Sequence, residues 1–224
     1  MSPTRKQRRA IITERVAQRP PPKSGDANPD MTFHAVGAAL SAWEHLNTGF
    51  TFLFGQMANP TDNRVPHRAY GRIEDFNLKV EVLRAGSEAY FYAAEGIYGK
   101  ENTRAIKERF DDACITAQGL CARRNEIAHG CVRNILPEMS FEVLSKPQNE
   151  WPKGFALFPV IFSVKKRSYT PFTKPHYYYG ANEILYYKKE FDELAKELLR
   201  IVGLIDTINK FTIQFWKGRM KKEL

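Results

Sequence analysis

The sequence predicts a mainly all-α protein, in which four long helices form a bundle and a small β-hairpin is inserted between the third and the last of them. Two observations carry this prediction. Apolar residues recur at spacings of three and four in four long segments, which is the period of an amphipathic helix. Residues 137–180 lose that period, hold six prolines and have β-type composition in part. Helices with one apolar face each bury it best by packing together as a bundle.

The first helix is predicted at residues 30–56, with Asp30 and Thr32 as candidate N-caps. Residues 58–70 begin with an Ala-Asn-Pro break and are predicted to form a polar loop. The apolar stripe of this first helix consists of Phe33, Val36, Leu40, Trp43, Phe50 and Phe54.

Three further helices are predicted at residues 71–98, 101–129 and 181–216. The last one follows Gly180-Ala181-Asn182-Glu183, which is a capping box that lacks only its Ser or Thr. In the third helix, Arg124 occupies a position where the stripe requires an apolar residue, after Leu120 and before Ile127. A buried guanidinium is costly without a partner, so Arg124 is expected to line a cavity or to form a salt bridge. The acidic residues on the neighbouring helices that qualify as partners are Glu44, Glu74, Asp75, Glu81 and Glu88.

The predicted hairpin pairs residues 155–164 with residues 176–179. Its connecting segment carries Lys165, Lys166 and Arg167 beside several aromatic residues. These cations are candidate substrate-binding residues, because lysines neutralise the phosphates of single-stranded RNA while aromatic rings stack on its bases. The alternative, which the composition favours, is that the aromatics hold the hairpin on the bundle while the lysines keep an exposed edge soluble.

The net charge of +9 is concentrated at the two ends of the chain. Residues 1–30 hold seven basic and three acidic residues, residues 210–224 hold five and one, and the remainder carries +1. We therefore predict a flexible basic Pro-rich tail at residues 1–29, a single helical domain at 30–216 and a basic tail at 217–224. Basic tails attract polyanions, although they also serve simply to keep a protein soluble.

Several classes of protein find no support in the sequence. No apolar run approaches the ~18 residues of a membrane-spanning helix, so no membrane association is predicted. The N-terminus lacks a secretory h-region, and the three cysteines do not form a Cys-x-x-Cys metal site, so we expect a cytoplasmic protein with reduced thiols. Phosphate-binding Gly-rich loops, Gly-x-Ser-x-Gly and His-Glu-x-x-His are all absent, and no cofactor or metal is predicted.

One segment does carry chemistry, at the end of the third predicted helix. It reads Arg123-Arg124-Asn125-Glu126-Ile127-Ala128-His129-Gly130. Asn125 and His129 are four residues apart and therefore lie on one face of a helix, within reach of the long Arg124 side chain. Gly130 follows where a helix end favours glycine, and a helix C-terminus stabilises a cationic His129.

The Arg-Asn-x-x-x-His pattern resembles the catalytic motif of the HEPN superfamily. That resemblance covers roughly residues 30–216 in its expected all-α fold, but only the octapeptide carries the chemistry. It implies a metal-independent RNase in which Arg124, Asn125 and His129 are catalytic, while Arg123 is a weaker candidate for substrate binding. It also implies a homodimer in which two motifs face one another, and a role in toxin–antitoxin or antiphage systems with a protein antitoxin or regulator as partner.

The residue types suit cleavage of RNA by its own 2′-hydroxyl. The reaction needs a base for the 2′-hydroxyl proton, an acid for the leaving 5′-oxygen and a cation beside the phosphorane. Imidazole transfers protons near neutral pH, and guanidinium supplies fixed charge in a bidentate fork. Two alternatives remain: a non-catalytic HEPN-like module that binds RNA or nucleotides or acts as a scaffold, and a structural helical dimer in which Arg124 is salt-bridged and His129 caps the helix.

Overall fold

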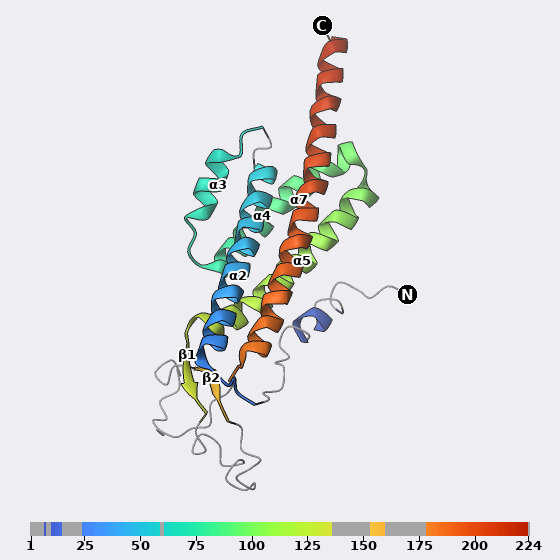
Figure 1. Ribbon diagram of the computed structural model, residues 1–224. Coiled ribbons are helices and arrows are strands. Elements are labelled where there is room, and N and C mark those ends of the chain that lie inside the picture. Colours follow the sequence, from blue (N-terminus) through green and yellow to red (C-terminus); the bar gives the residue numbers. More distant parts are fainter. Residues whose placement is uncertain are drawn as a thin grey trace, which may run out of the picture. The chain divides into compact units, whose positions relative to one another are not determined.

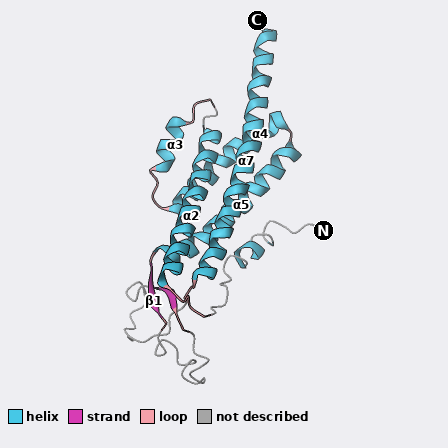
Figure 2. Ribbon diagram, viewed as in Figure 1, coloured by secondary structure: helices cyan, strands magenta, loops and turns pink. Residues whose placement is uncertain are grey.

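The computed structural model describes residues 7, 10–14, 24–58, 61–135, 153–159 and 178–223, and it confirms the predicted fold class (Figure 1). These residues are mainly helical and include one small antiparallel sheet between the third and the last long helix (Figure 2). The elements are α2 (Pro29–Ala58), α3 (Arg64–Gly71), α4 (Phe76–Tyr98), α5 (Lys100–Ala128), β1 (Gly130–Asn134), β2 (Phe155–Pro159) and α7 (Ala181–Glu223).

The helix boundaries agree with the sequence prediction except in two regions. The predicted loop at 58–70 contains α3, and α4 begins at Phe76 and not near residue 71, because Asp75 caps it by accepting a hydrogen bond from the Leu78 amide at 2.8 Å. At the other end of the chain, α7 continues to Glu223 and so passes through the region predicted to be a tail from residue 217.

The chain divides into two compact units, to both of which α2, α5 and α7 contribute. The first consists of Met1–Ala17, Glu44–Cys121 and Asp192–Leu224, and the second of Gln18–Trp43 and Ala122–Phe191. The octapeptide thus belongs to the second unit.

Aromatic pairs fill the core of the first unit. Phe54 stacks on Tyr70 of α3 with ring centroids 4.6 Å apart, and Phe91 of α4 meets Phe110 of α5 at 5.9 Å. One buried amide joins three helices, since Asn209 of α7 accepts a hydrogen bond from the Tyr90 hydroxyl at 2.8 Å and donates one to the Gln56 carbonyl at 3.0 Å. These contacts join α2, α3, α4, α5 and α7 in the core of this unit.

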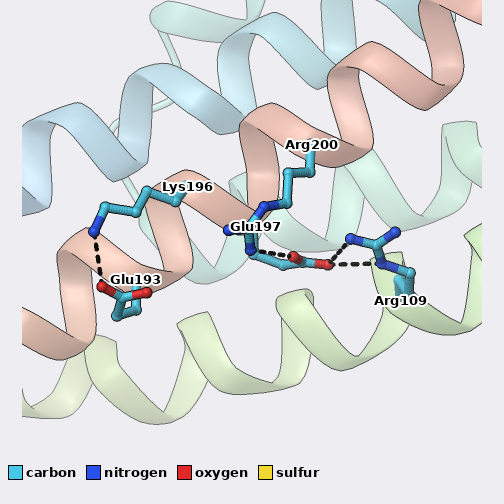
Figure 3. A network of polar contacts seen from close by, with 5 residues as sticks. All are labelled: Arg109, Glu193, Lys196, Glu197 and Arg200. Atoms are coloured by element: carbon cyan, nitrogen blue, oxygen red, sulfur yellow. Dashed lines mark hydrogen bonds and ion pairs between the residues drawn. The ribbon is translucent and has the colours of Figure 1, made fainter.

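An ion-pair network lies on the exposed side of this unit (Figure 3). The Glu197 carboxylate on α7 pairs with Arg109 of α5 at 2.7 Å and with Arg200 at 3.3 Å, and Lys196 pairs with Glu193 at 2.8 Å. Exposed pairs of this kind contribute about 0–1 kcal/mol each. The network therefore helps to align α5 with α7 more than it adds to the stability of the unit.

The sheet of the second unit pairs β1 with β2 in antiparallel register, with Val132 opposite Leu157. The predicted pairing of residues 155–164 with 176–179 is present only as a single bridge between Leu157 and Tyr179 on the other side of β2, within the described residues. The main partner of β2 is instead β1, which begins at Gly130, the last residue of the octapeptide. Asp26 forms a further bridge with Phe155, so part of the predicted tail joins the same sheet.

The start of α7 is capped by Glu183 and by the distant Asp26. Gly180 donates its amide to Glu183 Oε2 at 2.9 Å, which is the predicted reciprocal bond of the box. A second free amide of the first turn is satisfied from far along the chain, because Asp26 Oδ2 accepts from the Ala181 amide at 2.8 Å. Thr32 in the first turn of α2 donates to the same carboxylate oxygen at 2.5 Å, so one buried group ties α2 to α7.

The N-cap predicted for the first helix is wrong by a few residues. Asn28 Oδ1 accepts a hydrogen bond from the Asp30 amide at 2.7 Å, and Pro29 is the first helical residue. Asparagine is a favoured N-cap and proline a favoured first residue, whereas Thr32 is already buried inside the helix.

Among the helices that the structure describes, none combines the length and the apolar character required to cross a bilayer.

Candidate functional site

The octapeptide forms the junction between α5 and β1. Helical hydrogen bonding continues through residue 129, where the His129 amide donates to the Asn125 carbonyl at 3.0 Å, and β1 begins at Gly130. In the described part of the chain, positive φ occurs only at Gly99 and Gly154, so Gly130 is not the left-handed cap that the sequence favours. Glycine is required there for another reason, because a Cβ atom would lie 2.5 Å from Leu157 Cγ on β2.

The three predicted catalytic residues lie at this junction. Asn125 and His129 are exposed, and Arg124 is half-buried. The Arg124 guanidinium donates from Nη1 to Asn125 Oδ1 at 3.1 Å, so the cation and the amide are in contact. His129 presents its imidazole to solvent one helical turn beyond Asn125. A charged donor, an amide and a titratable group thus occupy one solvent-facing end of α5.

The buried guanidinium of this helix belongs to Arg123 and not to Arg124. Arg123 is only 8% exposed, and its Nη2 pairs with Glu126 Oε1 at 2.9 Å. Helical stripes advance by steps of three or four, and here the buried residues are Leu120, Arg123 and Ile127. The predicted role of Arg123 in substrate binding does not fit this position, because its charge is turned inward and neutralised by a carboxylate one turn away.

Glu126 receives a second bond from a distant part of the chain. The Tyr179 hydroxyl, two residues before α7, donates to Glu126 Oε2 at 2.5 Å. Burial, assisted by this hydrogen bond, raises the pKa of Tyr179 well above its usual range, so the phenol remains a donor. Tyr187 packs edge-on against Tyr179 with ring centroids 5.6 Å apart. The last turn of α5 is therefore anchored from beneath by a buried polar cluster of Arg123, Glu126 and Tyr179.

This anchoring cluster was not anticipated, although part of it is visible in the sequence. Arg123 and Glu126 stand three residues apart, which is a spacing that brings opposite charges together on a helix. Tyr179 could not have been assigned in the same way, because it lies 53 residues after Glu126 in sequence and is placed beside it by its bridge to Leu157 of β2.

Arg123 retains hydrogen-bonding capacity that the cluster does not use. Its Nε and Nη1 atoms are buried and have no hydrogen-bond partner among the described residues. Burial of the Arg123 guanidinium costs desolvation free energy, and its pairing with one carboxylate offsets only part of that cost. Replacement of Glu126 would therefore leave a buried positive charge with no opposite charge to balance it.

The remaining candidates cannot be placed at this junction. Lys165, Lys166 and Arg167 lie outside the described residues. The described parts of the chain contain no group of three or more His, Cys, Asp or Glu side chains arranged to hold a metal ion.

No family model, curated protein or solved structure matches this chain.

Proposed function

We propose that this chain is a HEPN-type, metal-independent endoribonuclease that cleaves single-stranded RNA by attack of the 2′-hydroxyl. The observation that carries the proposal is the end of α5, where Arg124 contacts Asn125 and His129 is exposed one turn further on. The three groups that the reaction needs (a proton-transfer group, a fixed cation and a positioning amide) converge there on a rigid support.

Each residue has a distinct role in this proposal. His129 removes the proton from the 2′-hydroxyl, whose oxygen then attacks the adjacent phosphorus. The Arg124 guanidinium stabilises the extra negative charge on the phosphorane, and Asn125 orients Arg124 through the bond between them. The 5′-oxygen leaves with a proton, and the products are a 2′,3′-cyclic phosphate and a 5′-hydroxyl.

The buried cluster supports the proposal because catalytic groups must be held within a fraction of an ångström of their working geometry. Glu126 lies between the proposed catalytic residues Asn125 and His129 in sequence, and it is held by both Arg123 and Tyr179. The backbone that carries Arg124, Asn125 and His129 is thereby restrained.

A single imidazole cannot serve as base and acid in the same step, so the proposal includes a homodimer in which His129 of a second copy protonates the leaving oxygen. Light scattering should give twice the 25.8 kDa mass of one chain. A 25.8 kDa species that retains full RNase activity would exclude the two-copy site.

The reaction is tested by incubating labelled single-stranded RNA with the protein in EDTA. Wild type should release fragments ending in a 2′,3′-cyclic phosphate. Arg124→Ala should reduce the rate by about 10²–10³, and Asn125→Ala should reduce it less, because Asn125 acts through Arg124. Arg104→Ala is the matched control, since Arg104 is an exposed arginine on the same helix.

Intact RNA after incubation with wild type, or equal loss of activity in Arg104→Ala, would refute the nuclease proposal. Retained RNA binding without cleavage would favour the non-catalytic binding module. If the nuclease activity is found, a role as a toxin or antiphage component, controlled by a protein antitoxin, becomes the natural physiological setting to test.

A further inference from the structure

The C-terminal part of α7 carries large apolar side chains that the first unit leaves exposed. Phe211 is 47%, Phe215 44%, Trp216 48% and Met220 57% exposed. Every described residue from Gln214 to Met220 is exposed. Monomeric proteins rarely expose so much aromatic surface in one place unless it binds something.

This same segment is strongly basic. Residues 210–223 hold Lys210, Lys217, Arg219, Lys221 and Lys222, against the single acidic residue Glu223. The aromatic and basic side chains are also in contact, because the Arg219 guanidinium lies over the Trp216 ring at 5.7 Å from its centroid. The occupant of this surface should therefore be negatively charged and able to stack on aromatic rings.

The position of Arg219 distinguishes among the anionic occupants. On a helical wheel it lies about 40° from Phe215 and about 60° from Trp216, so a cation sits in the middle of the aromatic face. A lipid surface would require that cation to enter the apolar part of the bilayer, which is costly. A second copy of the helix would bring five positive charges against five. Single-stranded RNA suits the arrangement, because bases stack on rings while phosphates pair with the neighbouring cations.

We propose that Phe211, Phe215, Trp216 and Arg219 form a binding surface for single-stranded RNA. The surface belongs to the first unit and is separate from the catalytic residues at the end of α5. This inference rests on the proposed function for its choice of RNA, and it supplies that enzyme with a site that captures the strand without selecting a sequence, since every base has a face that can stack.

The test measures binding of a fluorescein-labelled, 2′-O-methylated single-stranded RNA by fluorescence anisotropy. Methylation removes the attacking hydroxyl, so binding is measured whether or not the protein cleaves RNA. Trp216→Ala should weaken binding about 5- to 100-fold, which corresponds to the loss of one stacked base. Tyr92→Ala, which removes an aromatic side chain that is 83% exposed on α4, should leave binding unchanged.

Salt dependence provides a second and independent readout. Arg219→Gln should reduce the slope of log K against log salt by about 0.7, because that is the contribution of one phosphate contact on a single strand. Lys196→Gln on the same helix removes a cation that is already paired with Glu193, and it should leave the slope unchanged. All these side chains are exposed, and circular dichroism should report equal helix content.

The surface proposal is overturned if Trp216→Ala and Arg219→Gln bind the RNA as tightly as the parent. It is also overturned if these variants lose only self-association, or lose only binding to phosphatidylglycerol vesicles, while RNA affinity persists. If Arg124→Ala loses cleavage but binds the RNA with unchanged anisotropy, the result concerns the catalytic site alone. Each of the two proposals can therefore be refuted without the other.

Discussion

Asp26 is the residue that connects most parts of the second unit, because its carboxylate accepts from the Ala181 amide and the Thr32 hydroxyl at once. Its backbone also exchanges two hydrogen bonds with Phe155, each 2.8 Å long. The start of α2, the start of α7 and strand β2 therefore meet at one residue, which lies in a segment predicted to be a tail.

Asp26→Ala should lower the free energy of unfolding by about 1–3 kcal/mol, because two buried donors lose their acceptor. Asp30→Ala is the matched control, since Asp30 is exposed in the first turn of α2, and it should cost less than about 1 kcal/mol. Urea denaturation of both variants makes the comparison. Equal losses in the two variants would mean that Asp26 contributes only the general charge effect of a helix N-terminus.

The sequence alone could not show which of the two adjacent arginines, Arg123 or Arg124, is buried. Steps of three and four are both compatible with a helical stripe, so Leu120 predicts a buried residue at either 123 or 124. The structure buries Arg123, because Glu126 and Tyr179 provide partners on that side. The local spacing was readable in the sequence, whereas the choice between the two arginines depended on a tyrosine more than fifty residues away.

At the scale of the elements, the junction of α5 with β1 depends on the absence of a side chain at Gly130. Gly130→Ala should destabilise the protein and disturb the sheet, because the new Cβ would lie within 2.5–2.9 Å of three Leu157 side-chain atoms. If the end of α5 is the active site, RNase activity should fall as well.

Gly203→Ala on α7 is the contrasting variant, because a Cβ there would meet nothing within 4 Å. Alanine in an exposed helix interior stabilises by about 0.5–1 kcal/mol relative to glycine. Thermal melting should therefore rise for Gly203→Ala and fall for Gly130→Ala. The opposite order would show that the contact with Leu157 does not constrain the junction.

The long helices could be predicted because the spacing of apolar residues that specifies each helix lies within its own segment. The pairing of the strands could not be predicted in the same way. The stripes of α2, α5 and α7 specify the helices. They do not fully specify the buried faces, because Phe33 of the predicted α2 stripe is 57% exposed while Ala35 and Ala39 are buried. The composition of residues 155–159 specifies a strand but not its partner, and the partner proved to be Gly130–Asn134. That strand is short and directly follows a helix, so its own pattern is too brief to be distinguished from a helix end.

At the scale of the whole molecule, both units hold buried or half-buried tyrosines whose phenols are kept protonated. Burial is the main cause that raises the pKa of Tyr70, Tyr90, Tyr179 and Tyr187. The unfolded chain releases these protons near pH ~10, while the folded chain retains them. The folded state then binds more protons, so the free energy of unfolding is undiminished below pH ~10 and falls as the pH rises above it.

Urea denaturation between about pH 8 and pH 11 measures this loss. Tyr179→Phe should make the decline above pH ~10 shallower, because one protonated phenol has been removed. Tyr92→Phe should leave the profile unchanged, since Tyr92 is 83% exposed. Identical profiles for wild type and both variants would contradict the assignment of buried, protonated phenols.

The nuclease account depends most directly on the imidazole of His129. In EDTA, wild type should cleave single-stranded RNA, and His129→Ala should be slower by about 10²–10⁴, because a proton-transfer group has been lost. His34→Ala, at an exposed histidine on α2 in the same unit, should cleave at the wild-type rate. Cleavage by His129→Ala at the rate of His34→Ala would contradict the account.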